Sequence, residues 1–267
     1  MKLLTYSGID TSTTPAATQL RLEDLLAPVF DVANSSSSLL ASRHEVRLGT
    51  RHYDIPKFLL LGQRGGGKPI RVGLFAGLDA GSLQTVAALT RLLIQHELSP
   101  ALARDYALFA YPAVNLRGFE EPALSLDEFE AYSAATPTTP DAQFFRAELE
   151  GWNFDGLISF RLDPKAQGFH ATTRSEVLGQ EVILPALHAI GNKLPVETIP
   201  VELLPARLTN YGPGKLTVPI GSRLHPFEFE LFAPGLLSEE QQITGLFLVI
   251  QEILRNYRRV ISHAQDI

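Results

Sequence analysis

A buried strand followed by a glycine-containing turn and an amphipathic helix is the feature that most restricts the fold of this chain. Residues 70–76 (Ile-Arg-Val-Gly-Leu-Phe-Ala) form an apolar run typical of a buried strand. The turn at 77–82 leads into residues 83–96, where apolar side chains recur at helical spacing and Ser82 is placed as the N-cap. A strand, a turn and a helix in this order form half of a parallel βαβ unit, so the pattern predicts an α/β sheet.

The rest of the chain continues this alternation. A last helix is predicted over 239–260, since Ser238 and Gln241 form a capping box at its start. We expect a single α/β domain over residues 43–267, with a central mixed, mostly parallel sheet flanked by helices. Residues 1–42 are predicted to be an N-terminal extension that contains a short helix. The remaining strands are predicted over 58–61, 106–111, 157–160 and 227–232.

The composition excludes several classes of function. The chain has 267 residues and no cysteine, so thiolate nucleophiles, disulfides and cysteine-ligated metals are ruled out. A formal net charge of −6 argues against a nucleic-acid partner, which requires a basic face. No run of about 18 apolar residues is present, which argues against a membrane-spanning segment. The first residues lack the apolar core of a signal peptide, so we expect a cytoplasmic protein with no membrane partner.

A glycine-rich segment raises the alternative of a phosphate-binding loop. Residues 62–68 (Gly-Gln-Arg-Gly-Gly-Gly-Lys) fit the Gly-x4-Gly-Lys part of that motif. The motif also requires Ser or Thr after the lysine and a helix whose N-terminus faces the phosphate. Pro69 stands at that position and a predicted strand follows, so the segment is interpreted as a hairpin turn.

Polar side chains follow or end the predicted strands, where sites form in open parallel sheets. Each of these side chains alone is more often a cap or a loop residue, and their shared location is what makes them candidates for binding. The candidates are Asp79, Ser82, Asn115, Arg117, Arg161 and Asp163, with Glu230 in the last strand and His170 shortly after the third.

Four segments that contain candidate residues resemble, in the same order along the chain, segments of the zinc carboxypeptidases and their succinylglutamate desuccinylase/aspartoacylase relatives. Residues 77–82 (Gly-Leu-Asp-Ala-Gly-Ser) resemble the Gly-Ile-His-Gly-Asp-Glu turn of that family. Residues 111–120 (Tyr-Pro-Ala-Val-Asn-Leu-Arg-Gly-Phe-Glu) are similar to its Pro-x-x-Asn-Pro-Asp-Gly-Phe segment and give the most specific match. Residues 155–161 resemble the strand that delivers the third zinc ligand, and residues 227–234 the strand with the catalytic glutamate. The resemblance implies a carboxypeptidase-like, phosphorylase/hydrolase-like fold and places Glu230 at the general-base position.

At the zinc-ligand positions, the chain departs from the family. A catalytic zinc needs three protein ligands and an open position, and the family supplies His, Glu and a distant His. The matching residues here are Asp79, Ser82 and Arg161. A serine hydroxyl is a poor ligand, and a guanidinium stays protonated and has no acceptor. In addition, the family's Asp-Leu-Asn-Arg segment matches residues 125–128 (Ser-Leu-Asp-Glu), where the substrate-binding arginine is replaced by an acid.

These departures predict a protein without zinc, in which Arg161 pairs with Asp79, Asp163 or Glu230. A rearranged metal site is the alternative, with His170, Asp79 and Glu230 as ligands. A site at His225 and Glu228 is disfavoured, because residues i and i+3 of a strand point to opposite faces.

The function expected from the sequence is a carboxypeptidase-like pseudoenzyme. Its cleft is expected to bind a small polar, amino-acid or peptide ligand, with arginines attracting an anionic group and Asp79 and Glu230 a cationic one. Two alternatives stay open. The first is an active metal-dependent hydrolase, a carboxypeptidase or a deacylase of N-acyl amino acids, and the second is a scaffold that binds a partner.

Overall fold

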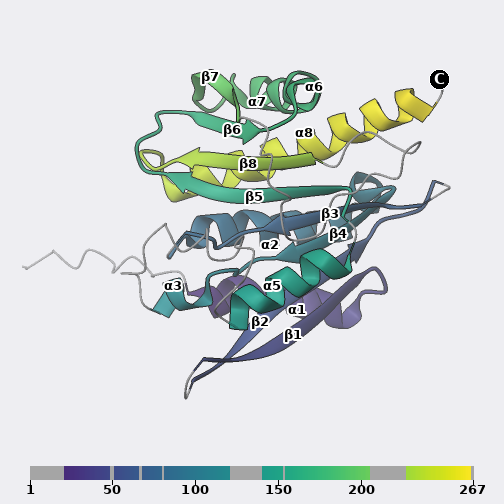
Figure 1. Ribbon diagram of the computed structural model, residues 1–267, viewed down its shortest axis with the longest axis vertical. Coiled ribbons are helices and arrows are strands. Elements are labelled where there is room, and N and C mark those ends of the chain that lie inside the picture. Colours follow the sequence, from purple (N-terminus) through teal and green to yellow (C-terminus); the bar gives the residue numbers. More distant parts are fainter. Residues whose placement is uncertain are drawn as a thin grey trace, which may run out of the picture.

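An eight-stranded sheet organises the protein in the computed structural model (Figure 1). The structure describes residues 21–48, 51–65, 68–79, 81–120, 140–152, 154–204 and 227–265. The strand order is β1-β2-β4-β3-β5-β8-β6-β7. The strands are β1 (Leu39–Leu48), β2 (Arg51–Leu61), β3 (Ile70–Phe75), β4 (Tyr106–Tyr111), β5 (Gly156–Asp163), β6 (Phe169–Thr173), β7 (Val196–Leu203) and β8 (Phe227–Pro234).

The direction of the strands makes the sheet mixed, as predicted. Strands β4, β3, β5 and β8 run parallel to one another in the centre. Strands β1 and β2 form a hairpin, and β2 pairs antiparallel with β4. On the other side, β6 is antiparallel to β8 and parallel to β7. The four central strands therefore end at the same edge of the sheet, here called the carboxyl edge.

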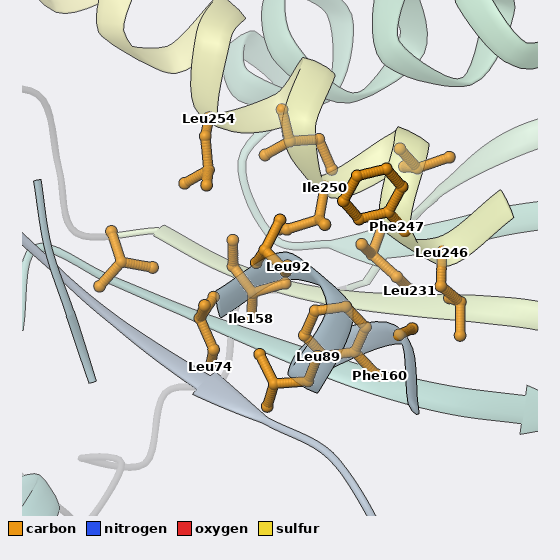
Figure 2. Packing of buried hydrophobic residues seen from close by; sticks show 14 of the residues in the cluster. Leu74, Leu89, Leu92, Ile158, Phe160, Leu231, Leu246, Phe247, Ile250 and Leu254 are labelled. Atoms are coloured by element: carbon orange, nitrogen blue, oxygen red, sulfur yellow. The ribbon is translucent and has the colours of Figure 1, made fainter. Parts of the chain in front are cut away.

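One face of the sheet carries most of the helices and the larger core. The helices of the described chain are α1 (Leu22–Ser35), α2 (Leu83–Leu98), α3 (Leu116–Glu120), α5 (Pro140–Gly151), α6 (Glu176–Leu178), α7 (Leu184–Ile190) and α8 (Glu239–Gln265), with short helical turns η1 (Pro100–Ala103) and η2 (Gly179–Ile183). Figure 2 shows Leu89 and Leu92 of α2 packed with Ile250 and Leu254 of α8. Ile158 of β5 lies between these helices, fully buried.

The opposite face is covered in part. Helix α5 packs over β1 to β4, where Phe145 lies against Phe75 and Tyr111 in a second apolar cluster. Among the described helices, none lies over this face of β5, β8 and β6 in Figure 1. The two faces alternate along β8: Phe227, Phe229 and Leu231 are buried toward α8, so Glu228, Glu230 and Phe232 point to the opposite side.

The segment before residue 43 takes part in this core. Helix α1 buries Leu26 and Val29 in the larger cluster, and β1 begins at Leu39 and pairs with β2 along its whole length. A domain boundary at residue 42 would cut β1, so residues 22–42 pack as part of the same domain. Residues 1–20 lie outside the described chain.

The predicted elements agree with those observed where the pattern was strong, but the hairpin expected at 62–68 is wrong, because β4 lies between β2 and β3 in the sheet. The predicted strand at 106–111 is β4, and the predicted helices over 83–96 and 239–260 are α2 and α8, each longer at its C-terminal end. The capping box is confirmed, since Ser238 N donates to Gln241 Oε1 and Gln241 N to Ser238 Oγ. Within the described residues, no helix combines the length and the apolar content needed to cross a bilayer.

Candidate functional site

The loops after β3, β4, β5 and β8 meet at the carboxyl edge, which lies at the left of Figure 1. The loop after β3 turns at Gly77, whose φ of 62° favours glycine and whose Cβ, if present, would lie 2.8 Å from the Pro112 carbonyl oxygen. Backbone bonds from Val114 N to Ala76 O and from Asn115 N to Gly77 O join this loop to the loop after β4. The two loops are therefore joined by backbone hydrogen bonds beside the end of β5.

Ser82 precedes α2 as predicted, but its hydroxyl does not cap the helix. Ser82 Oγ lies 2.7 Å from Thr85 Oγ1, and no backbone N–H of the first turn donates to it. Thr85 Oγ1 in turn donates to Ser82 O and accepts from Gly77 N. The sequence predicted that the Ser82 hydroxyl accepts a hydrogen bond from a backbone N–H of the first turn, and this is wrong. The hydroxyl bonds to the Thr85 side chain, which is a nearer partner. The Ser82 hydroxyl is buried in a network that joins the turn to the helix.

Asp79 and Arg161 form an ion pair at the centre of the edge. Asp79 Oδ1 accepts from Arg161 Nε at 3.0 Å and from Nη2 at 2.6 Å. Asp79 Oδ2 accepts from the backbone N–H of Leu162 at 2.9 Å. Only 8% of the Asp79 side chain and 15% of the Arg161 side chain are exposed. Of the three acids considered for Arg161, Asp79 is the one that it contacts, and the pair joins the β3 loop to the end of β5.

Asn115 is held between the two loops by its own amide. Its Oδ1 accepts from Gly118 N at the start of α3, and its Nδ2 donates to Leu78 O at 3.3 Å. The residue is 2% exposed, so both ends of the amide are used inside the protein. Asn115 was predicted as a binding residue, and in the structure it positions the loops. Arg117 follows in α3, and its side chain lies outside the described part.

His170 and Asp163 lie together near the carboxyl edge, on the face of β5, β8 and β6 that no described helix covers, which is here called the open face. His170 is the second residue of β6, and its ring stacks on Phe232 of β8 with centroids 4.7 Å apart. His170 Nε2 lies 3.8 Å from Asp163 Oδ2 at the end of β5. The sequence predicted that His170 reaches this edge. It follows the third strand through a short turn, and β6 places it there by running antiparallel to β8.

Glu230 lies one row further into the open face. Cross-strand pairing places Ser159 of β5 on one side of it and Thr172 of β6 on the other. Thr172 Oγ1 lies 3.4 Å from Glu230 Oε2, a long hydrogen bond. The sequence did not single out Ser159, Thr172 or Phe232. Thr172 belongs to a five-residue strand whose alternation is too short to be recognised without its partner strands.

The observed donor set does not fit a catalytic zinc. Both oxygens of Asp79 are bound by the protein, the Ser82 hydroxyl bonds to Thr85, and Arg161 has no lone pair to offer. Asp79 contacts Arg161, and Phe232 lies between Arg161 and His170 in the sheet. The three residues of the rearranged metal site, Asp79, His170 and Glu230, therefore do not come together. Within the described residues, no group of three His, Asp or Glu side chains is placed to hold a metal ion. His225 and residues 125–128 lie outside that part of the chain.

The sheet order and the loops at the carboxyl edge define the carboxypeptidase-like α/β fold, which confirms the predicted fold. A metallo-carboxypeptidase from Burkholderia cenocepacia superposes with a TM-score of 0.65 at 12% identity, covering 89% of this chain and 70% of that chain. A proposed metallopeptidase from Shewanella amazonensis gives 0.61 at 16% identity, covering 87% and 90%.

The deacylase branch shows the same fold. An aspartoacylase family protein from Mesorhizobium loti gives a TM-score of 0.53 at 13% identity, covering 80% of this chain and 68% of that chain. No family model matches the sequence, and no curated protein matches it either. At these identities the likeness shows a common fold.

Proposed function

We propose that this protein is a carboxypeptidase-like protein that does not carry out zinc-dependent hydrolysis. The Arg161–Asp79 ion pair is the observation that carries the proposal. A metal ion at this position would have to displace a guanidinium that makes two hydrogen bonds to Asp79 in a largely buried setting. Two positive charges cannot share one carboxylate oxygen there without strong repulsion.

The proposed role is the binding of a small polar ligand, such as an amino acid or a peptide end, on the open face near the carboxyl edge. Ligand sites of α/β sheets lie at the carboxyl ends of the strands. In this protein Asp163 and His170 lie near that edge, and Glu230 lies one row further into the sheet. A cytoplasmic location belongs to the same proposal. A partner-binding scaffold on the same fold would instead give a stable complex in pull-down and no rise in melting temperature with small ligands.

The direct test compares the natural protein with a variant in which zinc ligands are restored. Hydrolysis of N-acyl amino acids and of C-terminal peptide bonds is measured with and without a chelator. The natural protein is expected to show none above background. The triple variant Asp79→His, Ser82→Glu and Arg161→His is expected to bind zinc, while Asp79→Asn alone is expected not to.

One result would overturn the proposal, and another would remove the correspondence between these positions and a zinc site. Chelator-sensitive hydrolysis by the natural protein would make it an active metallohydrolase with Glu230 as the general base. A folded triple variant with no gain in zinc affinity would show that these three positions do not correspond to a ligand set. Circular dichroism of the variant establishes that it is folded.

A further inference from the structure

Two rows of side chains cross the open face of β5, β8 and β6. One row consists of Ser159, Glu230 and Thr172, and the next toward the carboxyl edge consists of Arg161, Phe232 and His170. Aligned residues of neighbouring strands project from the same side of a sheet, so each row is a line of adjacent side chains. All of them except Thr172 are partly exposed. This surface combines one carboxylate, one guanidinium, two hydroxyls and a stacked pair of rings.

The charges on either side of Glu230 are compensated. Toward the carboxyl edge, the Arg161 guanidinium is bound to Asp79. Two residues earlier along β8, Glu228 Oε2 lies 3.8 Å from Arg174 Nε. Among the described residues, Glu230 makes no ion pair, and its hydrogen bond is the long one from Thr172. A partly buried carboxylate with one weak donor is unusual, because burial of a charge costs free energy that a partner has to offset.

The residues around Glu230 suit a positive partner. The Thr172 and Ser159 hydroxyls can accept hydrogen bonds from an ammonium, as can the carboxylate between them. The Phe232 ring, held by its stack on His170, lies on the same face two residues further along β8. Cations are attracted to such ring faces by about 0.5–2 kcal/mol. A carboxylate group would instead meet Glu230 directly and be repelled.

We infer that the ligand carries a cationic group, an ammonium or a guanidinium, and that Glu230 is its counter-ion. This inference rests on the proposed binding function and narrows it, because it makes the amino end of an amino acid or peptide the recognised end. The anionic group expected at Arg161 from the sequence is not required, since Asp79 already occupies that guanidinium.

Two matched ligand panels test the charge of the ligand. The amides of L-amino acids with uncharged side chains carry an ammonium and no carboxylate, and the N-acetyl derivatives of the same amino acids carry a carboxylate and no ammonium. Binding of both panels to the natural full-length protein is measured by calorimetry and by the shift in melting temperature. We expect members of the amide panel to bind and members of the acetyl panel not to bind.

Variants of Glu230 connect the binding to this residue. Glu230→Gln keeps the shape and removes the charge, so it is expected to weaken amide binding at least tenfold. Glu230→Asp is expected to retain part of the affinity. Glu181→Gln is the control, because Glu181 is exposed on η2, on the helical side of the sheet. It is expected to leave the binding constant unchanged.

The other outcomes contradict either the inferred charge of the ligand or the proposed binding function. If acetyl derivatives bind and amides do not, the charge inference is wrong while the binding function stands. If amides bind equally well to Glu230→Gln, the cation lies elsewhere and the inference is again wrong. If neither panel binds, the proposed ligand-binding function fails together with the inference.

Discussion

At the level of single residues, Asp79 is the carboxylate on which the geometry of the carboxyl edge depends. It receives the Arg161 guanidinium on one oxygen and the Leu162 N–H on the other. Arg161→Met would leave a nearly buried carboxylate without its counter-charge. We expect this variant to lose about 3–5 kcal/mol of unfolding free energy in urea denaturation.

The matched control for this prediction is the double variant Arg161→Met with Asp79→Asn. It removes both charges, so it is expected to recover more than half of the loss, because an unpaired buried charge costs more than an absent pair. Equal stability of the single and double variants would contradict the view that the ion pair is what holds Asp79 in place.

His96 predicts a pH dependence of stability. It is 1% exposed on α2, and burial, with a smaller contribution from the Arg258 charge, lowers its pKa from 6.5 to about 4. Below pH 6.5 the unfolded chain therefore binds a proton at His96 that the folded protein does not bind until about pH 4. Stability falls across this window by about 1.4 kcal/mol per pH unit, which gives about 2 kcal/mol at pH 5.

Urea denaturation at pH 7 and pH 5 measures this effect. His96→Leu is expected to show a pH-dependent loss smaller by about that amount than the natural protein, whatever its stability at pH 7. The exposed His188→Gln is expected to keep the natural pH dependence. If His96→Leu and the natural protein lose stability equally on acidification, His96 does not remain neutral in the fold.

At the level of elements, one carboxylate fastens α5 to the sheet. Glu148 Oε2 pairs with Lys57 of β2 and accepts from the Tyr111 hydroxyl at 2.6 Å and from Trp152 Nε1 at 3.1 Å. Burial, and after it the hydrogen bond to Glu148, raises the pKa of the Tyr111 phenol, so the phenol remains a neutral donor. The sequence did not predict this cluster, because its members come from three segments that are far apart in the chain. It did not predict α5 either.

Glu148→Ala is expected to cost about 2 kcal/mol or more, since it leaves a partly buried ammonium and a buried hydroxyl unpaired. Trp152 is the only tryptophan of the chain, so its fluorescence reports on this position alone. We expect a red-shifted emission and faster amide exchange in α5. Glu150→Ala removes an exposed pair with Arg146 and is expected to change stability by less than about 0.5 kcal/mol. An unchanged emission in Glu148→Ala would refute the role of Glu148.

Helix α8 contains a glycine, Gly245, that allows close packing on Phe169, which the sequence alone does not show. Gly245 lies in a helix interior, where alanine ordinarily stabilises by about 1 kcal/mol. A Cβ at this position would lie 2.0 Å from Cζ of Phe169 in β6, so Gly245→Ala is expected to destabilise by about 1–3 kcal/mol in denaturant unfolding. Gly151→Ala, where a Cβ meets nothing within 4 Å, is the control and should not destabilise. Stabilisation by Gly245→Ala would show that β6 does not pack closely on α8.

The strands that the sequence predicts are those whose own residues are apolar enough to indicate burial. Strands β3 and β4 are apolar at almost every position because they are buried on both faces. Strand β8 has apolar residues on the one face that packs against helices. Strand β1 carries charges on an exposed edge, β7 contains Pro200 and lies at the other edge, and β6 has five residues. Such strands exist because a neighbour pairs with them, which no local pattern records.

At the level of the whole molecule, the sequence predicted the fold and the edge of the sheet where polar residues gather. It could name Arg161 as incompatible with a metal, because the guanidinium has no acceptor in any setting. It could not choose among three acids for Arg161, nor show that Ser82 and Asn115 are occupied inside the protein. Those outcomes depend on the distance between loops that are far apart in the chain.

Metal content distinguishes a protein without a zinc site from a metallohydrolase. The protein is purified without chelator, its zinc is measured by elemental analysis, and the chelated protein is then titrated with zinc in a calorimeter. We predict substoichiometric zinc and no saturable site that depends on Asp79, so that Asp79→Asn gives the same titration. One tightly held zinc per chain that is lost in Asp79→Asn would contradict this prediction.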